Sequence, residues 1–146
     1  MLHALRLVAV LTAALFAGAA LYINIAEQPA RLKLDTRSAA SQWAPSYKRA
    51  TWMQAPMAVA SCGCGIAVWL LGGSAGWIVA ALLIGLVVPF TLLIIMPTNQ
   101  ALLSPGRDLS SAETRFLLER WGRLHAVRTV LSVAATLLYL WLLSAA

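Results

Sequence analysis

Charged residues are scarce in this chain, and acidic residues are the scarcest. Only 11% of the 146 residues are charged, with eleven Lys and Arg against five Asp and Glu. A soluble domain carries about 25% charged residues, so the composition argues against a soluble globular protein. The formal net charge of +6 does not indicate a nucleic-acid partner, because the basic residues lie mostly in short segments between apolar spans. We therefore predict no nucleic-acid binding.

Cysteine and histidine are also few. Cys62 and Cys64 are the two cysteines, and they lie two positions apart in an apolar run. Such positions on a helix point about 200° away from each other, so the two thiols neither share a metal easily nor form a disulfide without breaking the helix. We interpret them as small core residues. His3 and His125 are the two histidines, and we predict no metal site, because such a site normally needs three or more donors.

Four long apolar segments make up most of the sequence. They run over about residues 4–26, 53–71, 76–96 and 124–146. Each comes close to the ~20 residues that a helix needs to cross a hydrocarbon core of ~30 Å. Helices are expected because lipid cannot satisfy open backbone groups. The sequence therefore predicts an all-α fold, an integral membrane bundle of four antiparallel helices that forms a single domain over residues 1–146.

The basic residues indicate the orientation of this bundle. Five Lys and Arg lie between the first two spans and four between the last two, whereas Arg6 is the one near the other side. The positive-inside rule then places both long loops in the cytoplasm and both termini outside. We predict an integral protein of a bacterial inner membrane, in contact with membrane lipid.

Prolines and a capping pattern suggest where helices begin and end. A short interfacial helix is expected in the first long loop, ended by Pro45 before the second span. Pro89 is expected to kink the third span, which Pro97 ends. In the second long loop, Ser110 to Glu113 resembles a capping box. It predicts one continuous helix from about residue 111 to 144, which includes the fourth span.

Polar side chains gather at the span ends that face the two long loops. Alternating spans bring these ends together, and polar groups at membrane depth are costly, so their cluster is a candidate functional site. Arg128 and His125 lie one turn apart on the same face of the fourth span. We predict that Arg128 presents a fixed positive charge to an anionic or electron-rich ligand, with a salt bridge to Glu27 as the structural alternative. For His125 we predict a general base, against a merely satisfied interfacial histidine.

The candidate site has ten members. Three are assigned to catalysis: Glu27, His125 and Arg128. Seven are assigned to binding a small apolar or aromatic ligand: Asn24, Gln28, Tyr47, Arg49, Gln54, Asn99 and Trp121. The aromatic members have an alternative role in the aromatic belt at the membrane interface.

Four runs of residues carry a family resemblance. They are GAALYINIAEQPARL (18–32), PSYKRATWMQAP (45–56), PFTLLIIMPTN (89–99) and ETRFLLERWGRLHAVRT (113–129). Together they resemble the anthrone-oxygenase-like family, and the similarity covers nearly the whole chain. The resemblance implies a small four-helix membrane protein. It also implies oxidation of an anthrone-like or phenolic compound by molecular oxygen, without a well-established cofactor.

One position departs from the expected family pattern. Gln28 stands where we expect many relatives to have His, which weakens a metal site built there with His125. The cofactor therefore remains open between none, a metal and haem. A non-enzymatic membrane module is the alternative function: it would bind a lipid, a quinone or haem, or act as a small subunit of a larger complex. Small residues such as Gly63 and Gly85 leave a homo-oligomer open.

Overall fold

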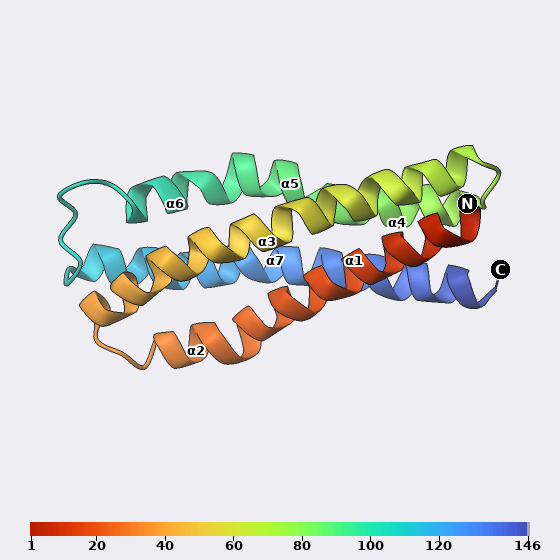
Figure 1. Ribbon diagram of the computed structural model, residues 1–146. Helices are drawn as coiled ribbons and strands as arrows, with labels where there is room; N and C mark the ends of the chain where they lie inside the picture. The colour runs from red at the N-terminus through yellow and green to blue at the C-terminus, as the bar shows by residue number, and fades with distance from the viewer. Residues whose placement is uncertain (146) are drawn as a thin grey trace.

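The computed structural model describes residues 1–145, and these residues form a bundle of four helical spans. Neighbouring spans run in opposite directions, with both termini at one end of the bundle (Figure 1). The spans cover Leu2–Arg31, Thr36–Leu70, Ala75–Leu102 and Ala112–Ser144, and each is long and apolar enough to cross a membrane. The predicted four-helix membrane bundle is confirmed. We call the end with the termini the terminal half and the opposite end the loop half.

The first and third spans each contain a π-helical turn. The first consists of α1 (Leu2–Tyr22), η1 (Ile23–Glu27) and α2 (Gln28–Arg31), and the third of α4 (Ala75–Gly85), α5 (Val87–Phe90), η2 (Thr91–Ile95) and α6 (Met96–Leu102). Pro89 lies in α5, between the end of α4 and η2, so the irregular stretch falls where a kink was predicted. The predicted end of the third span at Pro97 is wrong. Pro97 occupies the first turn of α6, where a missing N–H is tolerated.

The second span is one continuous helix, α3 (Thr36–Leu70). The predicted interfacial helix with a break at Pro45 is therefore wrong. Asp35 caps α3, because its carboxylate accepts a hydrogen bond from the Ser38 amide at 3.0 Å. This hydrogen bond lowers the pKa of Asp35. An interior proline removes one backbone hydrogen bond, and the burial of Trp43, which is 1% exposed, stabilises the helix around that defect.

The fourth span is α7 (Ala112–Ser144), which confirms the predicted long helix. Its N-cap is Ser111, whose hydroxyl accepts a hydrogen bond from the Thr114 amide at 3.2 Å. The predicted capping box of Ser110 and Glu113 is thus wrong by one residue. A cap oxygen reaches the amide two or three positions further on, and the first helical residue here follows Ser111.

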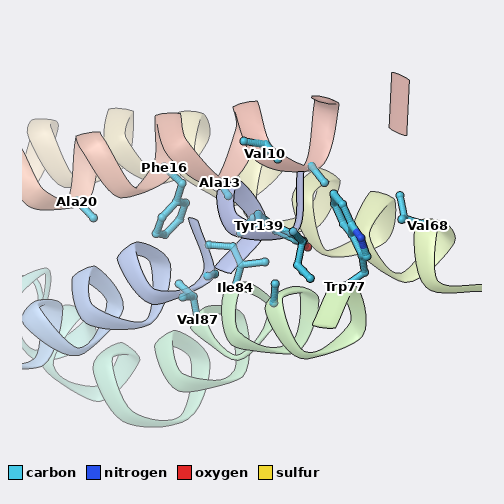
Figure 2. Close-up of a cluster of buried hydrophobic side chains, with 14 residues drawn as sticks. Val10, Ala13, Phe16, Ala20, Val68, Trp77, Ile84, Val87 and Tyr139 are labelled. Carbon is cyan, nitrogen blue, oxygen red and sulfur yellow. The ribbon is translucent and has the colours of Figure 1, made fainter. Parts of the chain in front are cut away.

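The terminal half is held together by apolar side chains, which we call the apolar core (Figure 2). Ala9, Ala13 and Ala20 on α1 are fully buried, and their small size lets neighbouring helices approach closely. The rings of Trp77 and Tyr139 lie 5.4 Å apart between centroids. This core fixes the helices at one end of the bundle and thereby positions the polar side chains of the loop half.

Candidate functional site

Arg128 on α7 is a buried charge of the loop half and is 9% exposed. Its Nη2 donates to Oε1 of Gln54 on α3 at 2.7 Å, and its guanidinium lies 5.4 Å from the centroid of the Phe16 ring. The salt bridge to Glu27 is not formed, because Glu27 pairs with Arg31 one turn along its own span. Among residues 1–145, no carboxylate lies within 4.0 Å of Arg128. An uncompensated charge in a membrane interior is costly and indicates a functional role.

Two N–H groups beside this contact lack a hydrogen-bond partner among the described residues. They are Nε of Arg128 and Nε2 of Gln54, and both atoms are buried. The orientation of the Gln54 amide follows from its neighbour, because Oε1 must face a guanidinium that can only donate. Most buried donors in proteins are paired. The two free donors therefore indicate a place where a ligand atom that accepts hydrogen bonds can sit.

His125 lies one turn before Arg128 and is 1% exposed. Its Nδ1 is 2.8 Å from Oδ1 of Asn24, while Nδ2 of Asn24 donates to the Gly122 carbonyl at 3.1 Å. The Thr129 hydroxyl donates to the same Oδ1. Because that oxygen can only accept, a neutral His125 carries its proton on Nδ1 and leaves the lone pair of Nε2 free. The arrangement thus prepares Nε2 to take a proton.

An ion pair lies beside the site on η1 and α2. Arg31 is 3% exposed and pairs with Glu27, and its Nη1 donates to Oε1 of Gln28 at 2.6 Å. Its guanidinium also lies 5.8 Å from the Trp121 ring centroid. Glu27 further accepts a hydrogen bond from the Ser46 hydroxyl. Glu27 therefore positions Arg31, and its predicted catalytic role stays a prediction.

Aromatic rings form a wall on the loop side of His125. Trp43 stacks on Tyr47 with centroids 5.0 Å apart and meets Trp121 edge-on at 5.8 Å. Trp121 in turn lies 4.9 Å from the His125 ring. Trp43 was not among the predicted site residues, although its ring contacts two of them, Tyr47 and Trp121. Its spacing of four from Tyr47 is the signal that could have placed both rings on one helix face.

Two hollows adjoin at Arg128. The polar pocket encloses about 10 Å³, roughly the space that one water molecule needs. The apolar cavity beside it encloses about 130 Å³. Residues of the polar pocket include Glu27, Arg31, Ser46, Gln54, Trp121 and His125. Residues of the apolar cavity include Phe16, Ala58, Val87, Thr91, Leu92 and Met96. Tyr47, Thr51 and Arg128 line both, so the guanidinium stands between a polar and an apolar compartment.

Four of the predicted binding residues lie outside both hollows. Asn24 and Gln28 support the site through His125 and Arg31. Asn99 is buried on α6 and lines neither hollow. Arg49 is exposed on α3 and lines neither hollow, so its predicted ligand contact stays a prediction. It precedes Gln54 by five residues, which rotates it about 140° around the helix.

Few side chains that could bind a metal ion lie near His125. Within residues 1–145, no three His, Cys, Asp or Glu side chains come together as metal ligands. At position 28, the Gln side chain donates through Nε2 to the Leu118 carbonyl at 2.8 Å, so it serves helix packing between the first and fourth spans.

Comparison with known proteins identifies the family of this chain. The family model described as anthrone oxygenase matches residues 43–138, which include Gln54, His125 and Arg128. The anthrone oxygenase tpcL of Aspergillus fumigatus is 32% identical over 142 residues, covering 89% of this chain and 87% of the relative. No solved structure gives a significant match. On the strength of the family model and of this relative, the chain belongs to the anthrone oxygenase family.

Proposed function

We propose that the chain is a membrane-embedded oxidoreductase that uses molecular oxygen to oxidise an anthrone-like, electron-rich ring compound to the corresponding quinone. The observation that carries this proposal is the pair of His125, with its Nε2 lone pair free, and Arg128, a buried cation one turn away. Kinship with the anthrone oxygenase tpcL supports the class of reaction.

The chemistry requires one proton transfer before oxygen reacts. An anthrone carries an acidic methylene, because the anion left by proton loss spreads its charge onto the ring oxygen. Nε2 of His125 accepts the methylene proton, and Arg128 stabilises the negative charge that develops. The carbanion then forms a C–O bond to oxygen, and the resulting peroxide anion takes the proton back from His125. Loss of water leaves the carbonyl, so one oxygen molecule yields one carbonyl and one water.

The surrounding residues support these two groups. Asn24 holds the His125 tautomer, and the ion pair of Arg31 and Glu27 closes the polar pocket beside them. A site of this kind excludes bulk water, which strengthens the interaction of Arg128 with an anion. Side chains fixed in advance need little reorganisation when the charge develops.

The loop half faces the cytoplasm in this proposal. Nine of the eleven Lys and Arg lie in the two segments that were predicted as long loops, and Arg6 is near the opposite end. The positive-inside rule supports that orientation. The site then lies at the cytoplasmic end of the bundle, with both termini on the other side.

Oxygen uptake by the purified protein in detergent tests the proposal. The wild-type chain, His125→Ala and Arg128→Met are compared on a panel of anthrones and phenols, with quinone formation followed by absorbance. We expect each substitution to lower the rate by about 10²-fold, the size of effect found for a general base or an oxyanion donor. His3→Ala and Arg120→Met change exposed residues of the same kinds and should retain the wild-type rate.

Two outcomes would count against this assignment. Full activity in both variants would remove the proposed roles of His125 and Arg128. A wild-type protein that consumes no oxygen with any member of the panel would favour the alternative of a ligand-binding membrane module.

A further inference from the structure

We infer that the site binds a planar ring compound as its oxyanion, with the oxygen atom in the polar pocket and the rings in the apolar cavity. Gln54 is assigned as the residue that binds this oxygen together with Arg128. The inference rests on the proposed function for the reaction itself. The binding mode depends on the two hollows and on the hydrogen-bond donors beside them.

The sizes of the two hollows limit what each can hold. The polar pocket, at about 10 Å³, matches a single oxygen atom and is far too small for a ring. The apolar cavity is the larger at about 130 Å³ and is lined mostly by apolar side chains such as Phe16, Val87 and Met96. Because Tyr47 and Arg128 line both hollows, one molecule can occupy both. Such a molecule is apolar over its body and carries an oxygen at one edge.

The free donors select an acceptor oxygen. Nε2 of Gln54 and Nε of Arg128 belong to side chains joined by the 2.7 Å hydrogen bond, and neither atom has a partner among the described residues. Both residues line the polar pocket. An oxygen that accepts from both satisfies two buried donors at once, in the manner of an oxyanion hole.

The charge balance selects the ionised form of that oxygen. The charged or titratable groups around the polar pocket are Glu27, Arg31, Tyr47, His125 and Arg128. Glu27 and Arg31 form an ion pair, which leaves Arg128 as the charged group of this pocket that has no ion-pair partner among the described residues. A phenolate or enolate oxygen neutralises it, whereas a neutral carbonyl does not. An opposite charge within about 4–6 Å lowers an acid's pKa by about one to three units.

The opening of the apolar cavity indicates where the ring compound comes from. Thr51, Ala55 and Leu92 on the cavity wall are exposed, and they mark a rim between α3 and η2. These two segments separate toward the loop half (Figure 1). Leu92 is 57% exposed and Trp52 beside the rim is 84% exposed, so the rim is an apolar surface of the bundle. In a membrane-spanning bundle it faces hydrocarbon, and the ring compound is taken up from the bilayer.

A coloured probe tests this binding mode without turnover. A monohydroxyanthraquinone changes its visible absorbance when its phenol ionises, and its methyl ether cannot ionise. We expect the wild-type protein in detergent to bind the phenol, to lower its apparent pKa by about one unit or more, and to bind the methyl ether about ten-fold more weakly at neutral pH.

The variants identify the residues that cause the shift. Gln54→Glu places a carboxylate against Arg128 and should abolish the pKa shift, whereas Gln54→Leu removes one donor and should reduce it. Gln100→Glu makes the same chemical change at an exposed position of α6 and should keep the full shift. If Gln54 served only to hold the fold, these substitutions would leave the pKa of a bound phenol unchanged.

The results separate this inference from the proposed function. Absence of binding, or binding with an unshifted pKa, would overturn the binding mode even if the wild-type protein consumes oxygen with an anthrone. A shifted pKa that depends on Gln54, in a protein that oxidises no anthrone, would support the binding mode and overturn the proposed reaction.

Discussion

The two halves of the bundle use the same four helices in different ways. In the terminal half, small and aromatic side chains such as Ala13, Trp77 and Tyr139 fill the space between regular helices. In the loop half, polar side chains are buried, and both π-helical turns occur there, η1 with Asn24 and η2 beside the apolar cavity. Such turns are frequent at functional sites. The terminal half is thus specialised for apolar packing, whereas the loop half combines an apolar cluster around Trp43, Leu118 and Trp121 with the polar side chains of the site.

The largest effect, a loss of stability, is expected from a substitution in the terminal half. Trp77→Ala removes a side chain that is 2% exposed from the apolar core, and large-to-small substitutions of this kind cost about 3–5 kcal/mol. Unfolding by denaturant in detergent should show this loss, while oxygen uptake per folded molecule stays at the wild-type value. Trp141→Ala is the matched control, because Trp141 is exposed. A strong loss of specific activity in folded Trp77→Ala would break the division between the halves.

A smaller effect, on rate rather than stability, is expected from Asn24. Asn24→Leu removes the acceptor that holds the proton of His125 on Nδ1, so a fraction of the histidine adopts the wrong tautomer. We expect oxygen uptake to fall by about 10- to 100-fold, by analogy with residues that orient a catalytic ligand, with little change in the unfolding midpoint.

Asn24→Asp is the matched variant for this prediction. It keeps an acceptor oxygen opposite Nδ1 and should restore most of the lost rate. Equal rates in Asn24→Leu and the wild-type protein would show that the hydrogen bond to His125 serves packing alone.

The smallest effect concerns the helix cap on α3. The hydrogen bond from the Ser38 amide lowers the pKa of Asp35 in the folded chain. A lowered folded-state pKa means that the stabilisation is present above the ordinary value of about 3.9 and is lost as the pH falls through the folded pKa. Asp35→Asn keeps a cap without a charge. The thermal midpoint of the wild-type protein should therefore fall relative to that of Asp35→Asn below about pH 4, and the difference between the two midpoints should stay constant above it. A pH-independent gap would contradict the role of the carboxylate.

The sequence was sufficient for the architecture and for part of the site. Apolar spans and an uninterrupted run before the fourth span predicted the bundle and α7. The predicted helix break at Pro45 is wrong because the burial of Trp43 outweighs one missing backbone hydrogen bond. The salt bridge considered between Arg128 and Glu27 does not form because Glu27 pairs instead with Arg31, which lies four residues further along the same span. The hollows could not be predicted, since an apolar pattern does not distinguish a side chain facing lipid from one lining a cavity.

In the proposed reaction, every later step depends on His125 removing a proton from the ligand before oxygen reacts. Exchange of anthrone methylene protons for deuterium under nitrogen, followed by NMR in deuterated buffer, measures that step alone. We expect the wild-type protein to accelerate exchange about 10²-fold over His125→Ala, the size of effect found for general base catalysis. Equal exchange rates for the two proteins, with oxygen uptake still dependent on His125, would contradict it.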